Sequence, residues 1–117
     1  MADSALNTRA SAHSVAVTMD RLEAALKAQD IAVVARVNHA ASGDKLGMTL
    51  RPTEVILFAN PRLGTPLMQS NQRIGLDLPL KVLAWEDEAG KVWLGYTAPA
   101  DLASPYHIGD RAEVIQR

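Results

Sequence analysis

The sequence predicts an α+β fold, a two-layer α/β sandwich with helices on one side of a mixed, largely antiparallel sheet. The chain of 117 residues is 48% hydrophobic and only 4% aromatic, which suits one domain with an aliphatic core. Residues 55–59 form an apolar run between Pro52 and Asn60, a pattern typical of a strand covered on both faces. Residues 80–97 contain two apolar segments around a turn at residues 87–90, which predicts a β-hairpin in the C-terminal half.

Composition limits the classes of partner and the compartment. Lys and Arg number 12 against 13 for Asp and Glu, and the two signs are interspersed, so we expect neither nucleic acid nor a membrane as a partner. Cysteine is absent, which excludes disulfides, thiol nucleophiles and thiolate metal sites. The chain lacks a secretory signal pattern and any run of about 18 apolar residues, and these features predict a cytoplasmic protein.

The chain is predicted to begin with a flexible tail, residues 1–8, and to continue as a single domain over residues 9–117. Imperfect alternation indicates an edge strand at residues 9–17. Thr18 is a suitable cap for a helix that ends near residues 29–30. A strand at residues 31–37 and a short helical piece at residues 40–46 follow, and Gly47 is expected to stop that piece in a left-handed conformation.

The second half is predicted to contain the central strand, a helix and the hairpin. Thr65 and Pro66 suit the cap and first residue of a helix that runs to about residue 72 and turns Leu67 and Met68 toward the sheet. The hairpin strands are residues 80–86 and 91–97. The chain after Pro99 reads as interrupted helix.

Several short groups of residues in the middle of the chain occur in a familiar order. They are Leu50-Arg51-Pro52-Thr53-Glu54, Asn60-Pro61, Gly64-Thr65-Pro66, Leu78-Pro79, and Trp85-Glu86-Asp87 followed by Gly90-Lys91-Val92. Together they resemble the small bacterial family catalogued as domain of unknown function 302, over about residues 15–102. The resemblance implies a two-layer α/β fold and homodimers, and it implies no activity.

Two positions depart from that family pattern. Asn38 stands before His39 where Asp is common in such sequences, so a carboxylate that could bind a metal or accept a proton is missing. Leu80 follows Leu78-Pro79 where some members have Cys. Thiol chemistry therefore does not transfer to this chain.

Polar residues gather where the apolar strands end. Arg51 and Glu54 suit an ion pair that either positions a ligand carboxylate or phosphate, or simply fixes the strand. The segment from Asn60 to Thr65 joins a strand to a helix start, where backbone N–H groups and Arg62 suit an anion. The lysine and glycine spacing of a phosphate loop are absent, so an ordinary capped helix is the alternative.

The three histidines, His13, His39 and His107, share no metal-type spacing with another ligand, so no metal site is predicted from spacing. A site assembled through space from His39, His107 and Asp77 is the alternative. Asp77 lies in an apolar stretch, where it is either a general acid or base or a turn residue. The cofactor is unknown. Haem ligation by a histidine, or by Met48 or Met68, remains open.

The leading hypothesis is a homodimeric binding module for a small-molecule or anionic ligand or a partner, in a groove at the strand ends. One alternative is an enzyme that uses Asp77 or Glu54 with His39 as acid and base. A second is an interaction module that uses Trp85 and Trp93 on the hairpin. The candidate ligand-binding residues are Asn38, His39, Arg51, Glu54, Asn60, Arg62, Thr65 and Asp77.

Overall fold

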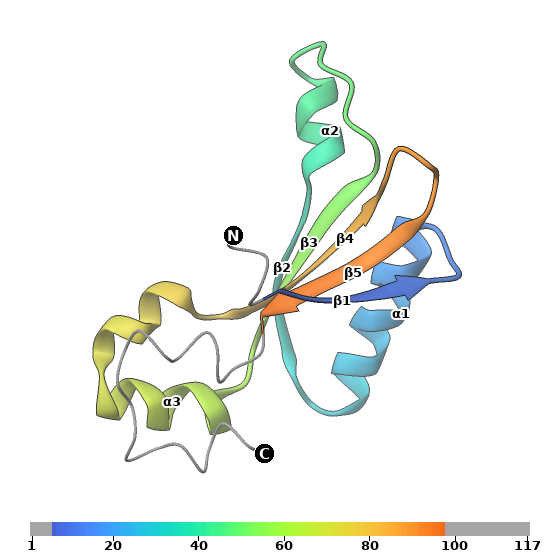
Figure 1. The fold of residues 1–117 in the computed structure, drawn as a ribbon. Coiled ribbons are helices and arrows are strands. Elements are labelled where there is room, and N and C mark those ends of the chain that lie inside the picture. Colours follow the sequence, from blue (N-terminus) through green and yellow to red (C-terminus); the bar gives the residue numbers. More distant parts are fainter. Residues whose placement is uncertain (1–5, 98–117) are drawn as a thin grey trace.

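The computed structural model describes residues 6–97, which form one five-stranded sheet with its helices (Figure 1). The strand order is β1-β5-β4-β3-β2, and every neighbouring pair is antiparallel. The predicted α+β fold is therefore confirmed. Along the chain the elements are β1 (Leu6–Ser11), α1 (Val15–Ala28), β2 (Ala32–Asn38), α2 (His39–Asp44), β3 (Thr53–Ala59), α3 (Pro61–Ser70), the 3-10 helix η2 (Gln72–Asp77), β4 (Leu80–Glu86) and β5 (Val92–Thr97).

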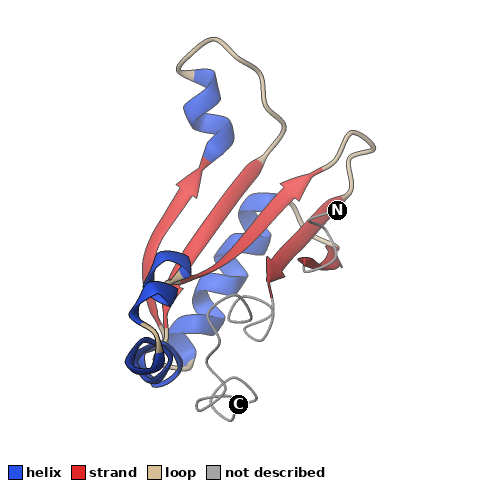
Figure 2. Cartoon of the chain, turned by 60° about the vertical axis from the view of Figure 1, so that its left-hand side comes forward, coloured by secondary structure: helices blue, strands red, loops and turns tan. Residues whose placement is uncertain are grey.

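Helix α1 lies against one face of the sheet and closes the main core (Figure 2). Its Met19 is fully buried against the aliphatic side chains of the inner strands, including Ile56 and Ala84. None of the helices in the described part of the chain is long and apolar enough to cross a membrane.

Strand β3 occupies a position next to the β2 edge of the sheet, and its two faces differ in burial. Glu54 and Ile56 are buried on the α1 side, whereas Val55 and Leu57 are half-buried on the other side. The expectation of a strand covered fully on both faces was therefore wrong for one of them. The reason is that α3 packs beyond the end of β3 and does not cover its second face (Figure 2).

The N-terminal boundaries differ from the sequence prediction. β1 includes residues 6–8 of the expected tail and ends at Ser11, so Val15 lies in α1 and not in a strand. Ser14 caps α1 by accepting a hydrogen bond from the Val17 N–H. Thr18, the expected cap, is buried, and its hydroxyl is 2.6 Å from that of Ser11.

Helix α3 also begins earlier than predicted. Pro61 occupies its first turn and Pro66 lies inside it, so Thr65 is not the cap. Leu67 is buried, but it packs with Ile74 of η2 in a second small cluster and not against the sheet as expected. Helices α3 and η2 thus form a separate lobe at one end of the sheet (Figure 1).

The hairpin is confirmed, since β4 has the predicted bounds and β5 begins one residue later than expected. Trp85 and Trp93 are paired across it, and Gly90 has the positive φ, 81°, that its turn requires. Gly47 also has a positive φ of 73°, as predicted. The helix expected after Pro99 lies outside the described residues, and so does His107.

Candidate functional site

The candidate residues occupy opposite ends of β3. This strand has seven residues, so its ends are roughly 20 Å apart at about 3.3 Å per residue. Asn38 pairs with Glu54 at one end. Asn60 follows the other end, and Asp77 precedes β4 there, because Leu80 pairs with Phe58. The eight candidates therefore do not line a single groove, and the two ends of β3 form separate sites.

Arg36 organises the first end from strand β2. Its Nε donates to Oε1 of Glu54 at 2.8 Å, and its Nη1 donates to Oδ1 of Asp20 at 2.7 Å and to Glu23 at 3.4 Å. Nη2 donates to the Ala16 carbonyl oxygen at 3.2 Å. This guanidinium therefore ties β2 and β3 to helix α1.

The ion pairs of this network change the pKa of Arg36. The hydrogen bond to Asp20, followed by the hydrogen bond to Glu54 and the charges of both carboxylates, raises the pKa of Arg36 above its usual range, although partial burial of the guanidinium acts to lower it. Glu54 is only 8% exposed, and a carboxylate at that depth needs a partner of opposite charge. Arg36 is that partner, so the pair is firmly structural.

A cleft of about 310 Å³ lies beside this network, between the start of α1, α2 and the start of β3. Asn38, Glu54 and Glu86 contribute to its lining. Arg51 does not form the expected ion pair with Glu54; its Nε donates instead to the Glu86 carbonyl oxygen at 3.2 Å. The correction has a simple cause, since Arg36 on the adjacent strand already occupies the carboxylate.

The remaining polar candidates at this end serve the short helix α2. The Asn38 side chain caps it by accepting from the Ala41 N–H at 2.9 Å. His39, its first residue, is exposed. Asp77 lies at the other end of β3, half-buried, so the structure does not bring it together with His39. Among the described residues, no three His, Asp or Glu side chains gather in a way that could hold a metal ion.

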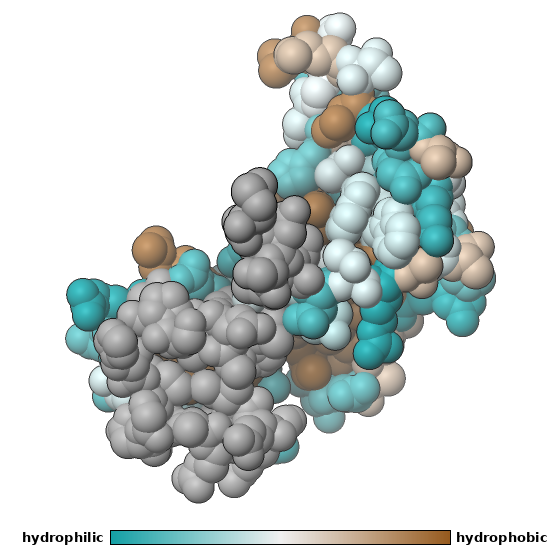
Figure 3. Space-filling view, viewed as in Figure 1, coloured by the Kyte–Doolittle hydropathy of each residue, from teal (hydrophilic) through white to brown (hydrophobic). Residues whose placement is uncertain are grey.

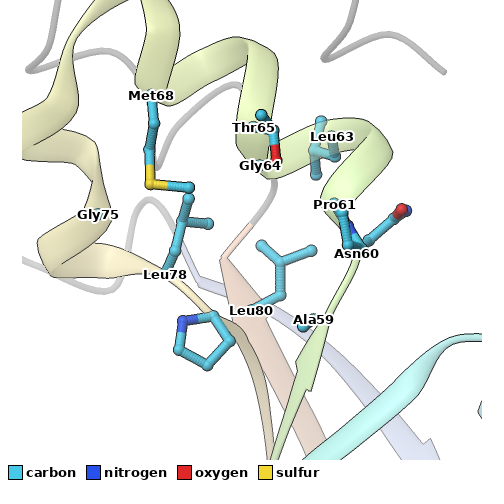
Figure 4. A pocket seen from close by; sticks show the side chains of 11 residues that line it. Ala59, Asn60, Pro61, Leu63, Gly64, Thr65, Met68, Gly75, Leu78 and Leu80 are labelled. Atoms are coloured by element: carbon cyan, nitrogen blue, oxygen red, sulfur yellow. The ribbon is translucent and has the colours of Figure 1, made fainter.

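The second end carries a cavity of about 310 Å³ between the end of β3, helix α3, η2 and the start of β4. Figure 4 shows the side chains of Leu63, Leu78 and Leu80 around this space, with Met68 above them. Gly64 and Gly75 also line it. A cavity of this size and apolar character is within the range of small-ligand sites.

Asn60 and Thr65 are the polar side chains of this cavity. Asn60 is the N-cap residue of α3, yet its side chain makes no capping hydrogen bond. The helix start is a weaker anion site than the sequence suggested, because Pro61 has no N–H and the Leu63 N–H donates to the Asn60 carbonyl oxygen at 3.0 Å. Arg62 is exposed and lines a neighbouring hollow with Asn60. The chemistry of the cavity is thus mainly apolar.

Sequence reasoning missed Arg36 and the apolar lining of the cavity. Arg36 and Glu54 are diagonal neighbours on adjacent strands, a relationship that favours an ion pair. The sequence does not reveal this relationship, because the 14 residues 39–52 separate the two strands and leave their register undetermined. Part of the lining, Gly75, Leu78 and Pro79, comes from η2 and the residues before β4, which the sequence presented as a loop.

Comparison with known proteins supports the architecture. The family profile described as "Domain of unknown function DUF302" matches residues 7–117. The crystal structure of an uncharacterized conserved DUF302 protein from Bacillus stearothermophilus superposes with a TM-score of 0.84 at 19% identity, covering 96% of this chain and 88% of that one. At this identity the likeness concerns the fold alone.

Curated relatives come from Brucella. The chain is 48% identical over 112 residues to proteins named "Fluoride-specific ion channel FluC 1" in Brucella suis and Brucella abortus. The match covers 96% of this chain but only 44% and 42% of those proteins. The chain thus spans less than half the length of the curated relatives that it matches.

Proposed function

Because the chain belongs to the family of domain of unknown function DUF302, whose description names no activity, we propose a function from its geometry: a cytoplasmic, homodimeric module that binds a small, mainly apolar ligand. The observation that carries this proposal is the cavity of about 310 Å³ at the junction of β3, α3, η2 and β4. Its apolar side chains supply affinity, and the two polar side chains at its margin supply orientation.

Two glycines and a polar residue shape the wall of this cavity, and the polar residue supports a ligand over a packing defect. A Cβ on Gly64 would lie 3.4 Å from Leu78 Cδ1, and one on Gly75 would lie 3.3 Å from Met68 Sδ. At both positions a side chain of the cavity wall therefore already lies close to the glycine backbone, and a Cβ on Gly75 would require Met68 to shift. The Asn60 side chain makes no capping hydrogen bond, so its amide is available to a ligand.

The test of ligand binding is a heteronuclear NMR titration with a library of small aromatic and aliphatic alcohols and acids, together with haem and divalent metal ions. We expect shifts for amides of α3, η2 and the start of β4. Thr65→Phe, at an exposed margin position, should block the cavity, whereas Arg62→Phe on the same helix should not. Well-folded protein with no shift for any compound would refute the proposal.

The dimer is a separate part of the proposal. The sheet face opposite α1 carries Trp85, Trp93 and Leu83, each half-buried, and Val37 on the edge strand, which is 38% exposed. Amphipathic aromatic residues of this kind are enriched at subunit contacts. Light scattering should give a dimer mass that Trp93→Ala reduces; a monomer that is indifferent to this change would remove the dimer from the proposal.

A second candidate function has its own support. The 48% identity to proteins named fluoride-specific channels extends over nearly the whole chain, so we propose that this module works beside a fluoride channel at the cytoplasmic side of a membrane. The test is fluoride efflux from proteoliposomes that contain such a channel, with and without the chain. A changed efflux rate supports the candidate, and an unchanged rate at saturating protein opposes it.

A further inference from the structure

We propose that the projecting arm formed by residues 39–52 is a membrane-docking element whose apolar tip enters the interface of an anionic bilayer. The arm consists of α2 and the chain that returns to β3, and it extends beyond the end of the sheet (Figure 1). This inference rests on the proposed work beside a fluoride channel and specifies the surface that the module uses there. It departs from the expectation, drawn from net charge, that no membrane is a partner, because the exposed apolar tip is local and does not change the net charge.

The first observation is the exposure of three large apolar side chains close together on this arm. Leu46 is 77% exposed, Met48 65% and Leu50 47%. Figure 3 shows hydrophobic side chains at the corresponding upper end of the molecule. An exposed apolar group of this kind is unusual on a soluble surface and marks an interaction site.

The second observation is that the arm holds this exposure by regular hydrogen bonding. The Met48 N–H donates to the Gly43 carbonyl oxygen at 3.0 Å and the Gly47 N–H to that of Asp44 at 3.0 Å, with Gly47 at φ 73°. This pattern is a Schellman motif. A Cβ on Gly43 would lie 3.1 Å from the Met48 carbonyl oxygen, so the close return of the chain needs that glycine.

The third observation is the charge around the tip. Lys45 and Arg51 flank the three apolar residues, and Asp44 is the one acid of the arm. Lys45 and Arg51 are both exposed, and the Nη atoms of Arg51 have no partner among the described residues. Apolar side chains flanked by cations match the acyl boundary and the anionic headgroups of a bilayer.

The size of the tip favours a bilayer over a protein surface. A stable protein interface buries roughly 800 Å² on each partner with matched shapes, and a tip of three side chains is too small to supply that alone. A bilayer requires no complementary shape. The Brucella relatives also carry a membrane-channel name, and their match leaves only about five residues of this chain outside it, so the arm lies within the matched region.

The experiment is co-sedimentation of the full chain with two kinds of vesicle. One contains phosphatidylcholine alone, and the other also contains about 30% phosphatidylglycerol to imitate an anionic leaflet. We expect binding to the anionic vesicles, and the triple variant Leu46→Ser, Met48→Ser, Leu50→Ser should lower the partition coefficient at least about tenfold. The matched control is Leu76→Ser, since Leu76 is 85% exposed on η2 at the opposite end, and it should bind like the parent chain.

A second readout locates the tip. Met48→Trp should gain fluorescence quenching by brominated lipids relative to the parent chain, whose Trp85 and Trp93 lie on the hairpin. Three results would each overturn the inference: no binding to either vesicle, binding that the triple variant retains, or binding only when a channel protein is present in the vesicle. The plain vesicles contain no channel, so failure here is distinct from failure of the efflux experiment.

Discussion

Arg36 and Glu54 join strand β2 to strand β3 through a 2.8 Å hydrogen bond between Nε and Oε1, with the carboxylate side chain 10% exposed and the arginine side chain 25% exposed. Removing one partner leaves the other charge poorly compensated in a low-dielectric position. We expect Arg36→Met to lower the free energy of unfolding by about 2 kcal/mol, below the value for a fully buried pair because of the partial exposure. Urea denaturation measures this loss.

The double variant Arg36→Met, Glu54→Leu tests the mechanism of that loss. Because neither charge then remains, its cost should be smaller than the sum of the two single costs. Lys27→Ala serves as the control, since it breaks an i,i+4 pair with Glu23 in which the lysine side chain is 66% exposed, and it should cost less than about 0.5 kcal/mol. Additive single costs would show that the pair is not coupled.

Asp87 gives a prediction about acid stability. Its carboxylate accepts hydrogen bonds from Trp93 Nε1 at 2.9 Å and from the N–H groups of Lys91 and Ala89 at 2.9 and 3.0 Å. The bond from Trp93 is the largest cause that lowers the pKa of Asp87 below its ordinary 3.8. A lowered pKa in the folded state stabilises the fold above the unfolded pKa and loses that contribution as the pH falls through the folded value.

Asp87→Asn should therefore be less stable than the parent chain at neutral pH and approach it as the pH falls below the ordinary Asp value of 3.8 and through the lowered pKa of Asp87 in the folded chain, because the parent then loses its own carboxylate contribution. Urea midpoints measured across this range check the convergence. A constant difference at every pH would mean that the lost stability comes from packing of the turn and not from the charge.

The hairpin and the order of elements were predictable because their signals are local. Alternation over β4 and β5 and the turn at Gly90 depend on neighbours in sequence. The starts of α1 and α3 were not predicted correctly. At α1, Ser14 and Thr18 are both good caps, and the choice between them depends on the contact of Thr18 with Ser11. Burial of that hydroxyl is a tertiary fact that propensity does not contain.

The candidate site was predictable only in part for the same reason. Polar residues at strand ends were identified correctly as positions, but their partners depend on strand register. Glu54 forms its ion pair with Arg36 and not with Arg51, because β2, which carries Arg36, lies beside β3. The cavity depends on how η2 folds under α3, which has no periodic signal in the sequence.

Two glycines should respond in opposite directions to alanine. Gly64 lies within α3, and an added Cβ would make an ordinary contact at 3.4 Å with Leu78. Gly64→Ala should therefore stabilise the chain by about 0.5–1 kcal/mol through helix propensity while it narrows the cavity. Gly47 has open space but a φ of 73°, so Gly47→Ala should cost about 1 kcal/mol.

Thermal unfolding of both variants measures the two signs. The same pair separates stability from ligand binding, because only Gly64 lines the cavity. A loss of stability in Gly64→Ala would indicate that Leu78 has no room to adjust and that the cavity is more rigid than proposed.

The two helix caps give a final contrast. The Ser14 hydroxyl accepts from the Val17 N–H at 3.2 Å, whereas the Asn60 side chain makes no such bond at the start of α3. Ser14→Ala should cost about 1 kcal/mol, and Asn60→Ala should cost less than about 0.5 kcal/mol, both by urea denaturation. An equal cost at the two positions would show that the Asn60 amide caps α3 in solution. That amide would then be unavailable to a ligand, and the proposed site would lose one of its two polar groups.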